Sequence, residues 1–494
     1  RCEGPGPVAG MKATVGVGVA ERKADDNLVP PGPDPIVGRP AGVAAGLAVD
    51  GDVLHGASSP RQSSSNACSL ALAWATAVAT VVGLFIAPAT FAQAAPAASP
   101  AALDPLTRGL EPIIVRGDQM PALIGVPVDR VRVYREVAGA WEIIPSQVDE
   151  MTATGAYTTT EDSLFDANDE VVFMAGDLGD AATTSITEAL TIAPFWYQVA
   201  VSDPLNPAQQ GWAYVVYDLS GGAATADYVD YDPGTLRVNA DNYVLGWATD
   251  HPGVDYLSLF GGPDILDRTK VRVRFHIGPV QGTLTEDSDL FNPPPPVAPV
   301  IDGPVRAIVR RGSATLLAYK SFLETQTPIS LSGLPAFVVI DEVRVSTDLA
   351  NTVAAGTYYN ENVPTGVTID GVPDVVPAIP FTQPWRQVSL GSGTVVQVAD
   401  VSGAGGAPAH YYKDDSAVDP NDTGDKQSFG DSGVVVANPT AQSFTVTSAQ
   451  YIVAGQPGNQ GAAFLAAFDN PLLVTPQLQQ QSLGQAVYLP IVRR

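Results

Sequence analysis

Short runs of alternating apolar and polar residues, separated by turns rich in Gly, Pro, Asp and Asn, fill the chain from about residue 104 onward. Residues 130–135 (RVRVYR) and 270–277 (KVRVRFHI) alternate strictly. Because side chains alternate across a strand, this period predicts strands with one buried face. Similar runs cover residues 196–201, 212–217, 337–345, 394–398 and 444–453. The pattern predicts an all-β, mainly antiparallel β-sandwich fold of one or two sandwich domains.

Helical periodicity is scarce, so we expect little helix. The clearest helical segment is residues 460–468, with Asn459 placed to cap it and Pro471 placed to prevent its extension. The four prolines at 293–296 predict an extended surface loop, because proline donates no hydrogen bond to a sheet.

Changes in composition and the positions of turn residues along the chain predict four parts. Residues 1–67 are rich in Gly, Pro and Ala without periodicity, which predicts a disordered or non-native leader. Residues 68–94 have the pattern of a signal peptide. The Gly221-Gly222 turn then separates an N-terminal β domain (95–220) from a C-terminal β-sandwich domain (235–494).

The signal-peptide prediction depends on an apolar run at 69–87 that carries no charge, followed by Ala92-Gln93-Ala94 as a small-x-small cleavage site. The run is also long enough to cross a bilayer, so an uncleaved membrane anchor is the alternative. We therefore expect the protein to be secreted or held in the cell envelope. Contact with the membrane is expected only through an uncleaved signal segment.

Charge narrows the possible partners. Cleavage after Ala94 would remove six of the 26 basic and seven of the 52 acidic residues, which leaves a net charge of −25. Such a charge argues against nucleic acid, whose phosphates require a basic surface. Both cysteines, Cys2 and Cys68, precede the cleavage site, so disulfides cannot stabilise the exported part. Calcium is a common substitute in exported proteins and suits an acidic chain.

Two acidic segments are candidate calcium loops, because calcium prefers six to eight hard oxygen ligands. In residues 161–180 the candidate ligands are Asp166, Asn168, Asp169 and Glu170. In residues 414–431 they surround Gly424, whose permissive φ allows a tight turn, and are Asp419, Asn421, Asp422 and Asp425. The alternatives are a solvated acidic turn for the first segment and a water-exposed hairpin loop for the second.

Candidate substrate-binding residues come from two places. Arg272, Arg274 and His276 should point to one face of a strand, where arginine can pair bidentately with the carboxylate of a uronate. His410 and Tyr411 add residue types that polysaccharide lyases of sandwich architecture use for proton abstraction. The alternatives are ion pairs with acidic residues on neighbouring strands, and a tyrosine that simply favours a strand.

Four stretches carry a family resemblance that spans most of the region after residue 95. Residues 144–150 (IPSQVDE) and 165–179 (FDANDEVVFMAGDLG) resemble a pattern in uncharacterised secreted bacterial β-rich proteins. Residues 358–374 and 423–433 are similar to later parts of the same group. The resemblance implies export and a β architecture, and it brings no activity with it.

Together these features predict an exported extracellular or envelope protein that binds or processes carbohydrate, with polysaccharide as partner and calcium as a structural ion. The alternative is a structural or surface-interaction protein without catalytic activity. The sequence decides neither whether the protein is an enzyme nor its oligomeric state.

Overall fold

The computed structural model describes residues 104–288, 293–331, 335, 337–353, 355–441 and 443–481. Antiparallel β-sheets dominate these residues, so the all-β prediction is confirmed. None of the helices among these residues could span a bilayer. The predicted leader, the predicted signal peptide and the end of the chain from residue 482 lie outside the described residues.

Two sheets built mainly from residues 104–218 enclose one core. The larger has the strand order β27-β7-β8-β3-β4, with β1 parallel to β8, and the smaller has the order β2-β6-β5. Val133, Phe173 and Val215 from the two sheets are fully buried against each other. The strands are β1 (Asp104–Pro105), β2 (Pro112–Arg116), β3 (Val131–Val137), β4 (Ala140–Ile143), β5 (Gln147–Asp149), β6 (Glu170–Met174), β7 (Ile192–Asp203) and β8 (Asn206–Asp218).

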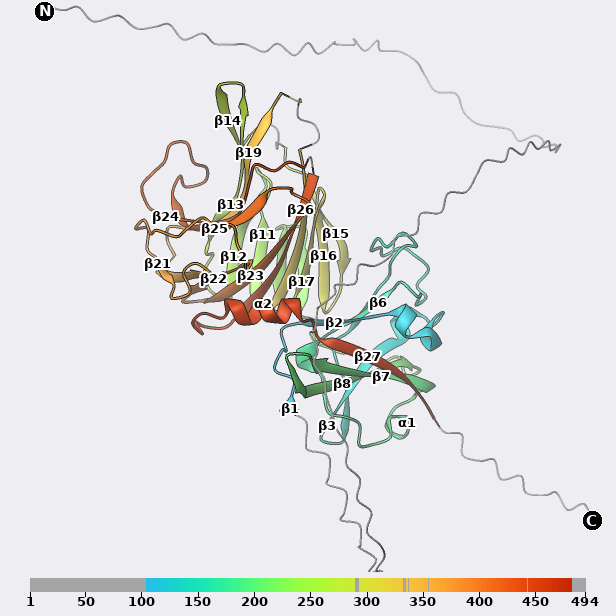
Figure 1. Cartoon of the computed structure of the whole chain (residues 1–494). Coiled ribbons are helices and arrows are strands. Elements are labelled where there is room, and N and C mark those ends of the chain that lie inside the picture. The colour runs from blue at the N-terminus through green and yellow to red at the C-terminus, as the bar shows by residue number, and fades with distance from the viewer. Residues whose placement is uncertain are drawn as a thin grey trace, which may run out of the picture. The chain divides into compact units, whose positions relative to one another are not determined.

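The last described strand returns to this first region. β27 (Leu473–Gln480) pairs antiparallel with β7, from Leu473 opposite Ser202 to Gln480 opposite Phe195, and the two strands lie side by side in Figure 1. The sequence pattern assigns residues 473–480 to the C-terminal domain (235–494). In the structure they pair instead with a strand of the first region. Strand propensity carries no information about the partner strand, whereas Pro476 does suit the edge position that β27 occupies.

Three further sheets form the second region. A nine-stranded sheet has the order β15-β16-β17-β18-β26-β23-β22-β20-β21; a five-stranded sheet has the order β14-β13-β19-β25-β24; and a four-stranded sheet has the order β12-β11-β10-β9. Buried residues of all three sheets share one core that includes Tyr243, Ile452 and Leu349. The five- and nine-stranded sheets share another, around Val273 and Phe444. This is sandwich packing of antiparallel sheets.

The bounds of these strands are β9 (Val229–Asp232), β10 (Arg237–Ala240), β11 (Tyr243–Trp247), β12 (Val254–Leu259), β13 (Leu266–Ile277), β14 (Val280–Thr285), β15 (Val297–Asp302), β16 (Arg306–Arg311), β17 (Ala314–Tyr319), β18 (Phe322–Ser330), β19 (Val339–Leu349), β20 (Gly356–Asn360), β21 (Val367–Ile369), β22 (Trp385–Leu390), β23 (Gly393–Ser402), β24 (Ala407–Asp415), β25 (Ser428–Ala437) and β26 (Ser443–Val453). Every run predicted as a strand overlaps one of the observed strands. The four prolines at 293–296 precede β15 and form no strand.

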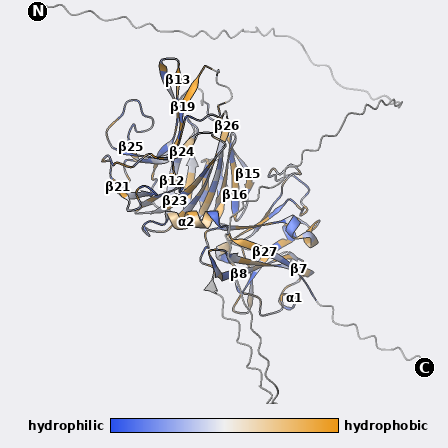
Figure 2. Cartoon of the chain, in the orientation of Figure 1, coloured by the Kyte–Doolittle hydropathy of each residue, from blue (hydrophilic) through white to orange (hydrophobic). Residues whose placement is uncertain are grey.

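The predicted helix is present as α2 (Gly461–Asp469), and the only other α-helix in the described residues is the single turn α1 (Ile186–Ala189). The N-cap position is Gln460 and not the predicted Asn459, which lies one residue earlier and accepts a hydrogen bond from the Gly461 N–H at 3.1 Å. The helix is largely apolar (Figure 2), and the Phe464 ring lies 4.5 Å from the Tyr451 ring of β26.

One buried arginine joins the two regions. Arg306, at the start of β16, is fully buried and forms ion pairs with Asp149 of β5 and with Glu170 of β6, the latter at 2.7 Å. Beside it, Gln147 Oε1 accepts hydrogen bonds from the N–H groups of Val305 and Arg306, at 2.8 and 2.7 Å. Arg306 therefore supplies one positive charge that is shared by two carboxylates buried at this junction.

Replacing Arg306 with methionine should lower the free energy of unfolding by roughly 3–5 kcal/mol, because Asp149 and Glu170 would be left buried without a counter-charge. Arg310→Met, an exposed position on the same strand, should change it by less than about 0.5 kcal/mol. Urea unfolding measures both. Equal stabilities for the two variants would show that the junction does not depend on this ion pair.

Candidate functional site

The outer face of the five-stranded sheet carries a row of cationic side chains on β13. In the register of β13 with β19, Lys270 lies opposite Ser346, Arg272 opposite Arg344 and Arg274 opposite Glu342. The intervening Val273 packs into the core between the sheets. The alternation predicted for this strand thus holds over these residues, with a bulge between Arg274 and Phe275.

Arg272 is buried and fully engaged. It forms ion pairs with Glu286 and with Asp422, the latter at 2.5 Å, and donates to Thr423 Oγ1 at 2.7 Å. These are the cross-strand and loop ion pairs that form the alternative to a substrate role. The charge of Arg272 is therefore balanced within the protein.

Arg274 and His276 are paired less completely. Arg274 Nη1 lies 3.3 Å from Glu342 Oε2, and the side chain is 56% exposed. His276 Nδ1 lies 2.7 Å from Asp341 Oδ1, and both side chains are about one-third exposed. Of the three predicted residues, Arg274 keeps most of its hydrogen-bond donors available to solvent or to a ligand.

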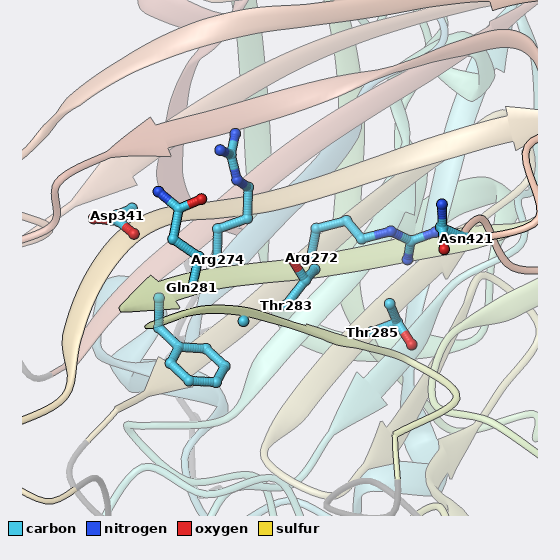
Figure 3. Close-up of a pocket in the computed structure, with 9 residues that line it drawn as sticks. Arg272, Arg274, Gln281, Thr283, Thr285, Asp341 and Asn421 are labelled. Atoms are coloured by element: carbon cyan, nitrogen blue, oxygen red, sulfur yellow. The ribbon is translucent and has the colours of Figure 1, made fainter. Parts of the chain in front are cut away.

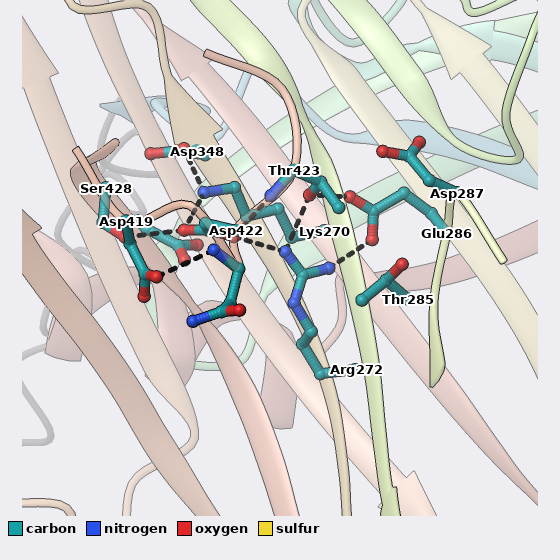
Figure 4. Close-up of polar contacts among 12 residues, drawn as sticks. Lys270, Arg272, Thr285, Glu286, Asp287, Asp348, Asp419, Asp422, Thr423 and Ser428 are labelled. Carbon is teal, nitrogen blue, oxygen red and sulfur yellow. Dashed lines mark hydrogen bonds and ion pairs between the residues drawn. The ribbon is translucent and has the colours of Figure 1, made fainter. Parts of the chain in front are cut away.

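The acidic segment after β24 folds over the same face of the sheet (Figure 4). Asp422 Oδ2 accepts from Lys270 Nζ at 2.8 Å, and Lys270 also lies 2.7 Å from Asp348 Oδ2. Burial alone would raise the pKa of Asp422, but Lys270 and Arg272 hold it well below its usual range. Of the predicted ligands in this segment, Asp422 thus serves as a counter-ion to two buried cations.

A cluster of three carboxylates lies at the end of this network. Asp267 of β13, Asp348 of β19 and Asp425 have ligand oxygens within 4.8 Å of one another. Gly424 makes the approach possible, because it has a φ of 64° and a Cβ there would collide with the Asp267 carboxylate. Burial and the charge of Asp431 raise the pKa of Asp348 to about 8. Asp425 is one of the predicted ligands, whereas its two neighbours come from distant strands and are not.

The other residues predicted as ligands in this segment lie elsewhere. Asp419 Oδ1 accepts a hydrogen bond from the Asn421 N–H at 2.9 Å, and Asn421 lines a hollow over β13 and β14.

The first acidic segment uses its side chains to close its own loop. Asp169 accepts hydrogen bonds from the N–H groups of Met151 and Asp166, at 2.9 and 2.8 Å. Asn168 Nδ2 donates to the carbonyls of Met151 and Thr152. Glu170 is the partner of Arg306. Within the described part of the chain, no acidic group of this segment belongs to a cluster of three potential ligands.

His410 and Tyr411 lie on opposite faces of β24. His410 is buried, with Nε2 donating to the Gln383 carbonyl at 3.1 Å and lying 3.7 Å from Glu361 Oε1. The Tyr411 ring lies 3.9 Å beneath the Arg344 guanidinium. The structure therefore does not bring His410 together with Arg272, Arg274 and His276.

The hollow over β13 and β14 has a volume of about 510 Å³ (Figure 3). Gln281, Thr283 and Thr285 of β14 form its floor, because they lie opposite His276, Arg274 and Arg272 in the hairpin register. Phe275 lies across Gly282, where a Cβ would collide with its ring. The hollow is lined by Arg272, Arg274, Phe275, Gln281, Gly282, Thr283, Thr285, Asp341 and Asn421.

The β14 residues of this hollow are absent from the sequence-based prediction. A usable signal is present, since Gly278-Pro279 forms a turn directly after the predicted strand and VQGTLT continues the alternation. Comparisons with known proteins add nothing to the site: no family model matches the chain, and no curated protein is similar to it in sequence.

His410 should make the protein less stable in mild acid. Burial lowers the pKa of His410, and Gln383 and Glu361 offset this only in part. Below about pH 6.5 the unfolded state therefore binds a proton that the folded state resists, and stability falls with pH by at most about 1.4 kcal/mol per unit. The variant His410→Gln keeps a donor for Gln383 but cannot titrate. From pH 7 to 5 the free energy of unfolding of the original chain should fall more steeply than that of the variant. Parallel curves would contradict this prediction.

Proposed function

We propose that this protein is an exported, non-catalytic, carbohydrate-binding β-sandwich protein that holds an acidic sugar in the hollow over β13 and β14. The observation that carries the proposal is the position of Arg274, a mostly exposed cation beside a row of uncharged polar side chains. The export signal suggested by the sequence supports a role outside the cytoplasm.

The chemistry of the hollow suits a uronate. A guanidinium has five N–H donors in a planar fork, and Arg274 directs one nitrogen to Glu342 at 3.3 Å, which leaves donors for a sugar carboxylate. Gln281, Thr283 and Thr285 offer amide and hydroxyl groups to sugar hydroxyls. Phe275 adds an apolar surface for the ring. The volume lies within the range of small-molecule sites.

Binding is favoured over processing because the groups expected for catalysis are separated or already neutralised. Arg272 is balanced by Glu286 and Asp422 and is not free to neutralise a substrate carboxylate. His410 lies on the other side of the five-stranded sheet and is buried there. A general base must reach the proton that it removes, and His276, the histidine beside the hollow, has its Nδ1 engaged by Asp341 at 2.7 Å.

The second candidate is a structural or surface-interaction protein that binds no sugar. The pairing of Arg272 and His276 with acidic neighbours favours it, because internal pairing alone then explains these side chains.

Removal of the Arg274 side chain separates the two functions. Arg274→Ala should weaken binding of oligogalacturonides at least tenfold, about 1.4 kcal/mol, because a charge-assisted hydrogen bond is lost. Arg310→Ala, an exposed arginine on β16, should bind as the original chain does. Titration calorimetry measures the affinities. No binding by the original chain would remove the carbohydrate proposal, and new absorbance from unsaturated uronates would instead favour processing.

We further propose that calcium binds between Asp267, Asp348 and Asp425 as a structural ion. The donors are hard carboxylate oxygens, as calcium prefers. Asp267 Oδ2 accepts no hydrogen bond, and Asp348 Oδ2 faces only the Lys270 ammonium. A cation there would tie the acidic segment to the ends of β13 and β19, and so would fix Asn421 at the edge of the hollow.

Calcium should raise the melting temperature of the protein by a few degrees, because a ligand that binds only the folded state stabilises it. Asp425→Asn should abolish the rise, and Asp166→Asn, in the other predicted loop, should preserve it. Differential scanning calorimetry with calcium and with chelator measures both. A rise lost in Asp166→Asn alone would move the site to the first loop, and no rise in the original chain would remove both sites.

A further inference from the structure

The edge strand β14 differs from the other strand edges in the described part of the chain. It pairs with β13 on one side, and no described strand pairs with its other side. Its sequence, VQGTLT, has no charged residue and no proline. Proteins usually protect exposed edges with lysine, proline, other charges or very short strands, since an unpaired edge is a template for another strand.

Every other sheet edge among the described residues has such protection. Prolines lie in β1, β2, β15, β24 and β27, and charged residues lie in β4, β5, β9 and β12. The strand β21 has only three residues. Among the described edge strands longer than three residues, β14 is therefore the one that has neither a proline nor a charged residue.

Exposed apolar side chains gather at the same end of the sheet. Val280 begins β14, is 65% exposed and lies opposite Ile277, which is also exposed. Val339 lies opposite His276, and Phe337, two residues earlier, is 65% exposed. Figure 2 shows this tip of β13 and β19 as hydrophobic. Apolar side chains beside an open edge mark an interaction surface.

We propose that β14 pairs with β14 of a second copy of this chain, so that two five-stranded sheets join into one. A two-fold axis perpendicular to the sheet makes the two strands antiparallel and keeps equivalent side chains on the same face. An axis at Gly282 places Val280 of one copy opposite Leu284 of the other. The paired strands then bring no carboxylate against another.

The edge is self-complementary, which favours a second copy as the occupant, because a two-fold axis at Gly282 pairs only uncharged residues of β14. The chain has a net charge of −26, so two copies repel each other over most of their surfaces. The uncharged β14 edge is where this repulsion between strands is least, and backbone hydrogen bonds with apolar contacts can then hold the pair together. The dimer does not depend on a ligand in the hollow. It would, however, place the two hollows on the same side of one continuous sheet.

Association can be tested with the purified full-length chain by sedimentation velocity from about 1 to 100 μM. The original chain should form a dimer, and added salt should strengthen it, because salt screens the repulsion between two acidic copies. Val280→Lys places a like charge in both edge strands and should weaken the dimer at least tenfold. Val375→Lys makes the same substitution at an exposed loop position and should leave the dimer intact.

Melting temperatures of the two variants should match that of the original chain, because both valines are exposed in the monomer. A monomer at all concentrations would overturn the proposal. A dimer that is equally strong in Val280→Lys would overturn it too, because association would then use another surface, such as the apolar run at 69–87.

Discussion

A buried carboxylate needs a counter-charge or hydrogen-bond donors, and this chain has twice as many acidic as basic residues. Several of its few cationic side chains lie where carboxylates from different segments meet. Arg306 serves Asp149 and Glu170 at the junction of the two regions. Lys270 and Arg272 share Asp422 and hold the acidic segment against the sheet. Since removing one partner of a buried pair leaves an uncompensated charge, these positions tolerate change poorly.

The same constraint explains why the cationic row on β13 is a poor guide to a site. Two arginines and a histidine at alternate positions in an acidic chain suggest a ligand, yet Arg272 and His276 are matched to acidic residues of the protein itself. Arg272 meets Glu286 and Asp422, and His276 meets Asp341. Of these three residues, the mostly exposed Arg274 keeps spare hydrogen-bond donors. A functional interpretation therefore has to consider which charges remain unpaired by the protein's own acidic residues. Only the structure shows this.

The local elements were predictable from sequence, and their partners were not. Period two located β13 and β26, and a cap residue located α2, because these signals lie within a few neighbouring positions. The return of β27 to β7 and the meeting of Asp425 with Asp267, 158 positions apart, have no local signature.

The spacing of acidic residues has the same limit, since Asp and Asn at alternate positions can surround an ion or close a loop. In the first acidic segment Asp169 and Asn168 close the loop through backbone hydrogen bonds. Only the approach of distant carboxylates separates the two outcomes.

β14 takes part in three features of the structure, because the two faces of a strand and its free edge point in different directions. Its odd-numbered side chains form the floor of the hollow, Leu284 faces the core shared with the nine-stranded sheet, and its backbone presents the open edge. Gly282 permits this arrangement, since its missing side chain leaves room for the Phe275 ring. Charge added at Val280 acts on the edge, whereas truncation of Arg274 acts on the hollow. The proposed sugar binding and the proposed self-association can therefore be separated by substitution even though both involve one hairpin.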